Sequence, residues 1–589
     1  MVQAPIRIGN ASGFYGDRFA AMREMLEGGE LDVLTGDYLA ELTMLILGRD
    51  RLRDPSLGYA RTFLRQLEDC LGLALERGVA IVANAGGLNP AGLASAVHEL
   101  AGMSGLGPKV GYVTGDDLLP RAAELGLAAA AGPAAAGPAA AGPAAAGPAA
   151  AGPAAAGGKL VAANAYLGGW GIAECLRAGA DVVITGRVTD ASLTLGPAAA
   201  HFGWARDDYD ALAGATAAGH VLECGAQATG GNYSFFTEIA DMRRPGFPIA
   251  EIYPDGSSVI TKHQGTGGAV TTGTVTAQLL YEIQGQRYPG PDVTLRLDTI
   301  RLAQDGPDRV RIDGTRGEPP PPRLKVSLNT LGGYRNQMEF VLTGLDVEAK
   351  AQLVRDQMAQ ADAEWTLSRT DHANAASEEE ASAILRCVVR DSDGTRTGRA
   401  FSAKAVELAL ASYPGFHVTV PPGDARPYGV FRAAYVDRDQ VRHTAVLPDG
   451  TPVTIEDPIH THELAVVHVA EPRAWPAGPT RRIPLGMVAG ARSGDKGGDA
   501  NVGVWTRDAR AWPWLAATLT AERIRELLPE AAMRRIHRYL LPNLNAVNFV
   551  IEGLLGEGVA AAARFDPQAK GLGEWLRARY VDVPKELLT

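Results

Sequence analysis

Short apolar runs alternate with helical patterns through the first 200 residues of this 589-residue chain. Each run is followed by a turn and a helix-like segment, and the runs are residues 6–9, 31–34, 79–82, 109–113, 160–163 and 182–184. Parallel strands are joined by helical crossovers and are buried on both faces, so this alternation indicates parallel β-α units. We predict a doubly wound, mostly parallel α/β domain over residues 1–245.

The pattern changes beyond residue 245. Longer alternating segments such as 293–302 and 324–328 are typical of antiparallel strands with one face in water, and helical patterns return later. We therefore expect an α+β continuation over residues 246–470 and a Pro-rich linker over residues 471–482. The tail, residues 483–589, has strands around a glycine loop and one long helical pattern over 515–539, which favours a ferredoxin-like domain.

One segment is a repeat without chemistry. Five copies of Ala-Ala-Ala-Gly-Pro run from Ala129 to Pro153. A Gly-Pro pair every five residues prevents a helix from propagating, and methyl groups and proline rings bury too little apolar area to offset the entropy of ordering the chain. We expect residues 128–158 to be a disordered surface insertion, or else a hinge or spacer.

Composition excludes several classes of protein. The chain carries 56 Lys and Arg against 67 Asp and Glu, a net charge of −11, which argues against a nucleic-acid partner. Its four cysteines form no C-x-x-C pair, so neither a zinc knuckle nor a disulfide framework is expected. No secretory signal and no membrane span are evident, and a cytoplasmic protein is expected.

Polar residues follow the predicted strands of the first domain. The carboxyl ends of parallel strands meet at one edge of a sheet, where small ligands bind. The candidates at this edge are Asn10, Ser12, Asp37, Tyr38, Asn84, Gly86, Gly87, Asn89, Asn164, Arg187, Thr189 and Asp190. Arg187 could clamp an anion through two parallel hydrogen bonds. The same residue types also form helix caps and turns, so each one alone has a structural explanation.

Two further clusters follow in the chain. Glu223 and Cys224 precede a glycine turn with Gly230 and Gly231, and Glu223 in an apolar setting is a candidate general acid or base. Cys224 is a candidate nucleophile, although a lone Cys beside apolar residues is usually core filler. The next loop resembles an anion-binding loop, with Lys262 followed by Gly265, Thr266, Gly267 and Gly268.

The tail contributes a second candidate loop, with Arg492, Ser493, Asp495 and Lys496 among three glycines. Turn geometry alone needs only one or two glycines, so this loop is interpreted as the second half of the site. His460 and His462, two apart on an expected strand, raise the question of a metal site without an assignable third ligand. The chain has neither a dinucleotide-binding nor a P-loop fingerprint.

Taken in order, the motifs resemble one family. The segments 8–17, 84–90, 184–192, 222–231 and 261–268 are similar to those of the acyclic terpene utilisation family named for AtuA, and 491–503, 543–549 and 553–558 resemble its terminal ferredoxin-fold domain. The resemblance covers nearly the whole chain. The Ala-Gly-Pro repeat departs from the family pattern but lies away from every matching motif.

The resemblance implies an enzyme of branched acyl-CoA breakdown, with a lyase step on a 3-hydroxy-3-alkylglutaryl-CoA. We expect an enzyme acting on a small carboxylated or CoA-linked acyl compound, with Glu223 or Asp37 moving the proton and Arg187 and Lys262 neutralising charge. The alternatives are a noncatalytic scaffolding subunit and an acyl transferase or hydrolase using Cys224. Coenzyme A as a substrate moiety and a divalent metal ion both stay open, and a homo-oligomer is expected.

The ligand pocket is the central expectation of this interpretation. Asn84, Arg187, Glu223 and Lys262 should face one common ligand, since polar turns from separate stretches of the chain are expected to meet in one shared hollow.

Overall fold

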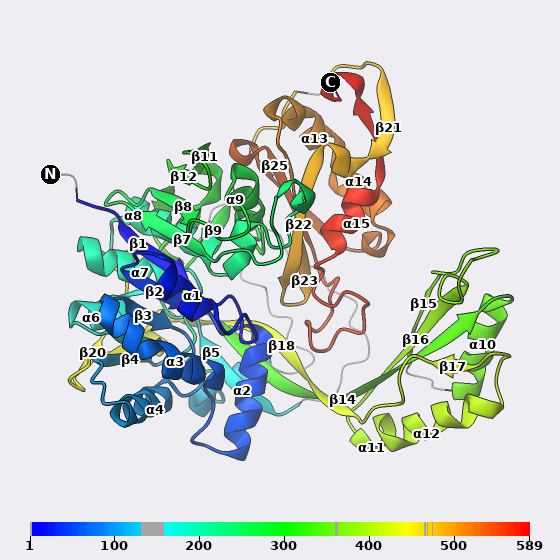
Figure 1. The fold of residues 1–589 in the computed structure, drawn as a ribbon, viewed down its shortest axis with the longest axis horizontal. Helices are drawn as coiled ribbons and strands as arrows, with labels where there is room; N and C mark the ends of the chain where they lie inside the picture. Colours follow the sequence, from blue (N-terminus) through cyan, green and yellow to red (C-terminus); the bar gives the residue numbers. More distant parts are fainter. Residues whose placement is uncertain are drawn as a thin grey trace.

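A computed structural model describes residues 3–130, 158–359, 363–464, 467, 469–473 and 475–588. Figure 1 shows an α/β body at the N-terminal end, a C-terminal domain beside it, and an arm that projects from the body on two long strands. Most of the Ala-Gly-Pro repeat, residues 131–157, lies outside the described residues, so the prediction of a disordered insertion stays a prediction.

The body is built on an eleven-stranded sheet. Its centre is parallel, in the order β1 (Ile6–Asn10), β2 (Val33–Gly36), β3 (Ala80–Ala83), β6 (Val182–Thr185) and β4 (Val110–Thr114). Antiparallel strands extend both edges: β7 (Pro248–Ile252), β8 (Ser258–Lys262), β12 (Val310–Asp313) and β11 (Arg301–Gln304) beyond β1, and β19 (Thr444–Val446) and β20 (Pro452–Thr454) beyond β4. The boundary expected at residue 245 therefore falls inside the unit that carries this sheet.

Helices cover both faces of the parallel strands. Ile81 and Ala83 pack with α1 (Ala21–Gly28), α3 (Arg61–Arg77) and α4 (Pro90–Met103), whereas Val82 packs with α6 (Trp170–Arg177), α7 (Ser192–Phe202) and α8 (Tyr209–Leu222). Successive side chains of a strand point to opposite faces, so two separate cores form on one sheet. The predicted doubly wound α/β fold is confirmed.

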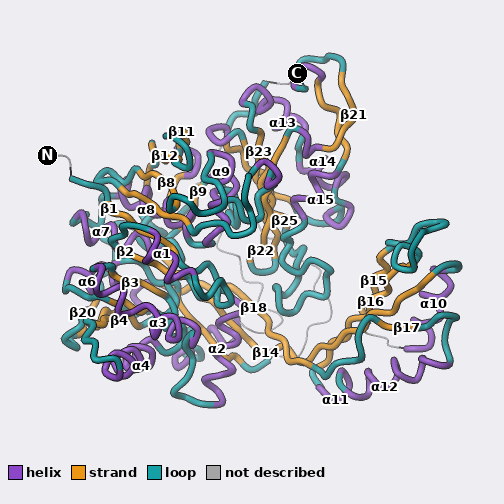
Figure 2. Tube along the Cα trace, viewed as in Figure 1, coloured by secondary structure: helices purple, strands orange, loops and turns teal. Residues whose placement is uncertain are grey.

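The arm rests on β14 (Arg323–Thr343), which pairs with β18 (Arg426–Asp437) near the body and with β16 (Ser382–Asp391) and β17 (His417–Val418) farther out. β15 (Glu364–Ser368) pairs with β16. Helices α10 (Val347–Met358), α11 (Gly394–Thr397) and α12 (Arg399–Glu407) belong to the arm, whose core is separate from those of the body. Figure 2 shows the two long strands running from body to arm.

One strand predicted for the parallel sheet lies elsewhere. β5 (Leu160–Ala165) pairs antiparallel with β14, so five of the six predicted strands form the parallel centre. Apolar runs show that a strand is buried but not which partner it finds. The remaining elements of the body are α2 (Glu41–Arg53), α5 (Leu127–Ala130), α9 (Thr272–Leu279), β9 (Arg287–Pro289), β10 (Thr294–Arg296) and β13 (Arg316–Glu318).

The C-terminal domain has a four-stranded antiparallel sheet in the order β22 (Ala489–Lys496), β23 (Asp499–Thr506), β25 (Ala546–Ile551) and β24 (Ile536–Leu541). The single long helix predicted over 515–539 is wrong. The chain forms α13 (Trp512–Thr518) and α14 (Ala521–Leu527), and then β24, because Pro529 lies where the helical pattern continues. α15 (Leu572–Ala578), β21 (Thr480–Pro484) and β26 (Tyr580–Pro584) complete the domain. No helix in the described part of the chain has the length and apolarity needed to cross a membrane.

Candidate functional site

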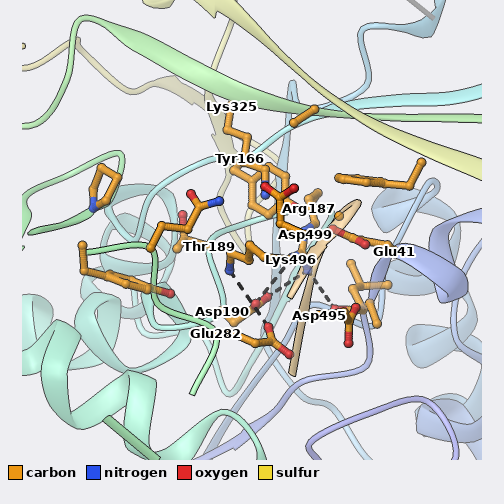
Figure 3. Close-up of a pocket in the computed structure, with 18 of the residues that line it drawn as sticks. Glu41, Tyr166, Arg187, Thr189, Asp190, Glu282, Lys325, Asp495, Lys496 and Asp499 are labelled. Atoms are coloured by element: carbon orange, nitrogen blue, oxygen red, sulfur yellow. Dashed lines mark hydrogen bonds and ion pairs between the residues drawn. The ribbon is translucent and has the colours of Figure 1, made fainter. Parts of the chain in front are cut away.

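A cavity of about 1480 Å³ lies where the body, the strands of the arm and the C-terminal domain meet. Asp37, Glu41 and Arg187 line it from the strand ends of the body, Lys325 from β14, and Lys496 from the C-terminal domain. Figure 3 shows Glu41, Arg187, Lys325 and Lys496 around one space. A pocket at a domain junction that is reached by several polar groups is a typical ligand site.

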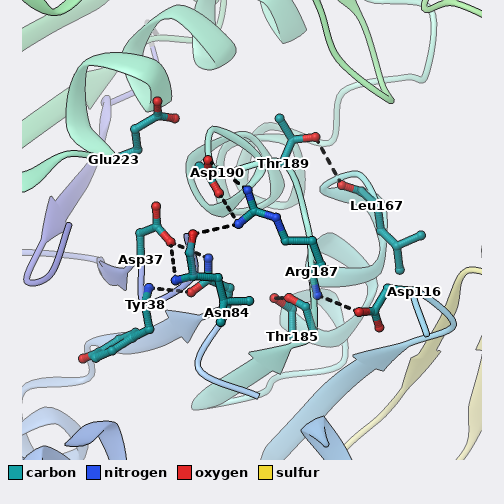
Figure 4. A network of polar contacts seen from close by, with 12 residues as sticks. Asp37, Tyr38, Asn84, Asp116, Leu167, Thr185, Arg187, Thr189, Asp190 and Glu223 are labelled. Atoms are coloured by element: carbon teal, nitrogen blue, oxygen red, sulfur yellow. Dashed lines mark hydrogen bonds and ion pairs between the residues drawn. The ribbon is translucent and has the colours of Figure 1, made fainter. Parts of the chain in front are cut away.

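A buried hydrogen-bond network forms the floor of the cavity (Figure 4). The Asn84 amide donates to Asp37 Oδ1 at 2.6 Å and accepts from the Tyr38 backbone amide at 2.7 Å. Arg187 donates to Asp190 Oδ1 at 2.8 Å and to the Leu39 carbonyl at 2.9 Å. The strand-end loops are thus tied to one another, since the Asn84 bonds and the Arg187–Leu39 bond join segments that are distant in sequence, while the Arg187–Asp190 bond stays within one loop.

The charges of this network are strongly coupled. Burial raises the pKa of Asp37 well above its ordinary value, and the Asp190 carboxylate adds to the rise while Arg187 and Asn84 oppose it. Burial by itself would lower the pKa of Arg187, but Asp190 and other nearby acidic groups leave it raised. Arg187 therefore stays charged, and its guanidinium is already occupied by protein acceptors.

Glu223 lies at the end of α8 with one oxygen free. His220 Nδ1 is 3.0 Å from Glu223 Oε1, whereas Glu223 Oε2 and His220 Nε2 are buried and have no hydrogen-bond partner among the described residues. Burial raises the pKa of Glu223, although His220 opposes this effect. A buried carboxyl oxygen without a partner at a cavity wall is costly unless a ligand or water satisfies it.

The C-terminal domain brings a cluster of opposite charges to the cavity. Lys496 Nζ is 4.0 Å from Glu282 Oε2, and Lys570 Nζ is 3.8 Å from Glu282 Oε1 and 3.6 Å from Asp495 Oδ1. These distances are at the edge of ion pairing, and the four side chains are only partly buried. The cluster is therefore looser than the network of Arg187.

Two glycines explain how this cluster is assembled. A Cβ at Gly494 would come within 2.4 Å of the Tyr281 ring, so the β22–β23 hairpin can approach the Glu282 segment only if the residue is glycine. Gly497 has φ +65°, which suits the tight turn between the two strands. The glycine density of this loop thus serves a turn and a close domain contact.

The electrostatics of the cluster follow from its charge balance. Burial would lower the pKa of Lys496, but Glu282, Tyr166 and Glu223 outweigh burial and the net shift is upward. Burial would raise the pKa of Glu282, but Lys496 and Lys570 reverse the effect. Both groups therefore carry their charges at neutral pH.

Two carboxyl groups of the cavity titrate near neutrality. Burial raises the pKa of Glu41 to about 7, with Lys325 opposing the rise. Burial and the neighbouring Glu282 raise the pKa of Asp495 to about 6, against the effect of Lys570. A carboxyl group with such a pKa can both give and take a proton at physiological pH.

The predicted site residues fall into two groups. Those that line the cavity are Asp37, Arg187, Thr189, Asp190, Glu223, Gly231, Asp495 and Lys496. Those that do not line it are Asn10, Ser12, Tyr38, Asn84, Gly86, Gly87, Asn89, Asn164, Gly230, Lys262, Gly265, Thr266, Gly267, Gly268, Arg492 and Ser493.

Several residues of the second group support the site from behind. Asn10 Oδ1 accepts from the Ser12 amide at 2.9 Å, Asn89 caps α4 by accepting from Gly92, and Asn164 donates to Asp116 at 2.8 Å. Tyr38 is buried and donates to Gln66 at 2.5 Å. These residues hold loop conformations, which is the structural role that the sequence also allowed.

Lys262 does not share the cavity with Arg187 and Glu223. Its ammonium is 3.1 Å from Asp308 and donates to the Thr266 carbonyl at 2.8 Å, and the Thr266 hydroxyl donates to the His263 carbonyl. The glycine loop after β8 therefore folds onto its own lysine. Of the four residues expected around one ligand, Arg187 and Glu223 line the cavity and Asn84 lies beneath it.

In the tail, Arg492 and Ser493 make structural contacts. Arg492 donates to Gln227 and lies over the Tyr281 ring at 4.3 Å, and the Ser493 hydroxyl donates to the Ala569 carbonyl at 2.6 Å. The Arg492 contacts join the C-terminal domain to the body, whereas the Ser493 contact lies within the C-terminal domain.

Other candidate chemistry is less well supported. Burial raises the pKa of the Cys224 thiol well above its ordinary value, and Glu223 adds to the rise, so the thiolate is disfavoured. His460 and His462 are exposed and lie outside any strand. Among the described residues, no three His, Cys, Asp or Glu side chains are grouped so that they could hold a metal ion.

The cavity residues that sequence reasoning missed include Glu41, Glu282, Lys325 and Lys570. Glu41 reads as an ordinary acidic residue in the first turn of α2. Glu282 has φ +56°, which is uncommon for a residue with a side chain, but no residue pattern reveals such a backbone angle. Lys325 and Lys570 reach the cavity only through the packing of distant segments.

Comparison with known protein families gives matches over most of the chain. Residues 6–447 match the model of the acyclic terpene utilisation family protein AtuA, and residues 483–582 match the AtuA ferredoxin-like domain. The curated proteins and the solved structures contain no match to the chain. Because the first match covers most of the chain and the second covers its tail, this protein belongs to the acyclic terpene utilisation family AtuA.

Proposed function

We propose that the protein is an enzyme that cleaves a carbon-carbon bond, or performs a related proton transfer, in a small carboxylated or CoA-linked acyl compound. The observation that carries this proposal is the buried Glu223 carboxyl. One of its oxygens has no partner among the described residues, in a cavity that Lys496 enters from another domain. Lys496 is close enough to influence the pKa of Glu223. A base and a fixed cation at one cavity match the needs of carbanion chemistry.

Cleavage of a 3-hydroxyacyl thioester illustrates the step. Ionised Glu223 takes the proton of the 3-hydroxyl group, the hydroxyl oxygen becomes a carbonyl, and the bond between carbons 2 and 3 breaks. Its electron pair moves toward the thioester, where the Lys496 ammonium offsets the charge of the enolate. A protonated carboxyl group, Glu41 or Asp495, then protonates carbon 2. The products are a carbonyl compound and a shorter thioester. The proton gained by Glu223 is released to solvent and the donor carboxyl group takes one up from solvent, which restores both groups for the next turnover.

His220 orients Glu223 in this scheme, because its ring holds one carboxyl oxygen and leaves the other without a protein partner among the described residues. Arg187 and Asp37 act as positioning residues, since Arg187 donates to Asp190 and to the Leu39 carbonyl and Asp37 Oδ1 accepts from Asn84. Lys496, and not Lys262, supplies the positive charge at the reacting group.

Replacing Glu223 tests the proposal. Wild type and Glu223→Gln are incubated with a panel of 3-hydroxyacyl-CoA esters, with and without a distal carboxylate, and products are identified by mass spectrometry. Loss of the base should lower turnover by about 10²- to 10⁴-fold with an unchanged melting temperature. Glu238→Gln, at an exposed carboxylate paired with Arg507, is the matched control. Wild-type turnover by Glu223→Gln would remove Glu223 from the mechanism.

A further inference from the structure

Two cations project from one strand into the cavity. Lys325 and Arg323 lie two apart on β14, so their side chains share one face of the sheet, and both line the cavity. The Lys325 ammonium lies 4.8 Å from the centre of the Tyr166 ring and 5.7 Å from that of Phe431. Arg323 lies over Tyr435 at 5.9 Å. Aromatic side chains thus hold both cations in place.

Lys325 differs from the other lysines of the cavity in having no carboxylate partner. Lys496 and Lys570 share Glu282, and Lys570 also faces Asp495. By contrast, the Lys325 ammonium forms no ion pair within 4.0 Å in the ranges that the structure describes. Figure 3 shows Lys325 beside Tyr166, away from the Glu282 and Asp495 carboxylates.

The Glu41 carboxyl group does not fully neutralise Lys325 near neutral pH. Glu41 is close enough for Lys325 to affect its titration, but burial raises the pKa of Glu41 to about 7, so near neutrality a substantial fraction is protonated. A half-buried ammonium flanked by rings loses part of its hydration and gains no fixed counter-charge. Such a group favours an anionic ligand.

We propose that Lys325, between Tyr166 and Phe431, seats an anionic group of the ligand, a carboxylate or a phosphate, with Arg323 extending the positive surface along β14. This inference rests on the proposed function for the identity of the reaction, but not for the binding itself. The ligand would be bifunctional, with its anion on β14 and its reacting carbon near Glu223 and Lys496. This anion-binding seat, formed by Lys325, Tyr166 and Phe431, would set the orientation and the choice of the substrate without taking part in the chemistry.

Binding measurements with two named probes test the seat. Glutarate offers carboxylates and coenzyme A offers phosphates, and each is titrated calorimetrically into wild type, Lys325→Met, Lys325→Arg and Lys585→Met. Loss of a charge-assisted contact should weaken the better probe about 10- to 100-fold in Lys325→Met. Lys325→Arg should bind within about threefold of wild type, because it keeps the charge. Lys585→Met removes an exposed lysine far from the cavity and should not change binding.

The probes distinguish the source of the anion. Binding of glutarate alone assigns a carboxylate to the seat, and binding of coenzyme A alone assigns a phosphate. Equal affinities for wild type and Lys325→Met would overturn the proposal, as would failure of both probes to bind wild type. If Lys325→Met does not fold, Lys325→Gln takes its place, and added salt should weaken the binding of wild type.

The binding test of Lys325 and the turnover test of Glu223 can fail independently. Glu223→Gln should keep its affinity for the probe while it loses turnover. Full turnover by Glu223→Gln together with weak binding by Lys325→Met would reject the proposed mechanism and retain the seat.

Discussion

The two polar clusters of the cavity are built differently. The network of Asn84, Asp37, Arg187 and Asp190 is held by hydrogen bonds of 2.6–2.8 Å, and Arg187 is only 6% exposed. The cluster around Glu282, by contrast, is held at 3.6–4.0 Å, and Lys496 is 27% exposed. The first joins loops of one sheet, whereas the second joins two domains.

This difference suggests that the first cluster supports the cavity and that the second takes part in ligand binding and turnover. A tight, largely buried network fixes the cavity floor, because breaking the bonds of Arg187 leaves its buried guanidinium without partners. A loose, partly hydrated cluster can exchange its contacts for those of a ligand at small cost. We infer that substitutions in the first cluster act mainly on stability and those in the second mainly on turnover.

Removing Arg187 should give the largest effect on stability. Arg187→Met leaves Asp190 without its cation and Asp37 without a compensating charge in a buried setting, so the free energy of unfolding should fall by about 3–5 kcal/mol. Lys496→Met, in the looser cluster, should cost less than about 1 kcal/mol. Urea denaturation of both variants measures the contrast. Equal losses of stability would abolish the distinction between the clusters.

A smaller effect should follow from the titration of Glu41. Its pKa rises from 4.5 to about 7, so the folded protein holds this proton more tightly than the unfolded chain does. The stabilising contribution is complete below pH about 4.5 and is lost as the pH rises through about 7. In wild type, the titration of Glu41 should lower the free energy of unfolding by about 1–2 kcal/mol between pH about 4.5 and about 7, after allowance for solvent screening. Glu41→Gln should lack this decline.

Unfolding free energies measured at pH 5 and pH 7.5 test this expectation. Glu463→Gln, at an exposed carboxyl group of the cavity rim, is the control and should follow the wild-type pH dependence. Identical pH dependence of Glu41→Gln and wild type would show that Glu41 is not held protonated by the cavity.

The sequence allowed the sheet and its strand-end loops to be predicted, because both depend on local patterns. Burial of residues 81–83 and 182–184 on two faces requires apolar runs, and the turns that follow require residues such as Asn84 and Arg187. Whether a loop binds a ligand or only supports the site depends on the hydrogen-bond partners of its side chains, and local patterns do not reveal these partners. Lys262 illustrates this limit, since its partner Asp308 lies 46 residues away.

The domain junction could not be predicted. Glu282 reaches the cavity through a left-handed backbone angle, and Lys325 through a strand that pairs with segments on both sides of it in sequence. No local periodicity encodes either contact. The glycines of the 494–498 loop were a feature of this junction that the sequence revealed. Gly494 is needed for the close approach to Tyr281, and Gly497 for the turn between the strands.

The most direct test of the central claim, that both domains serve one reaction, is a double-mutant cycle on kcat/KM. Glu223→Gln, Lys496→Met and the double variant are assayed with the best substrate of the thioester panel. If both side chains act on one reacting group, the double variant should lose much less than the product of the two single losses. Strictly multiplicative losses, or no loss in Lys496→Met, would contradict a shared site between the domains.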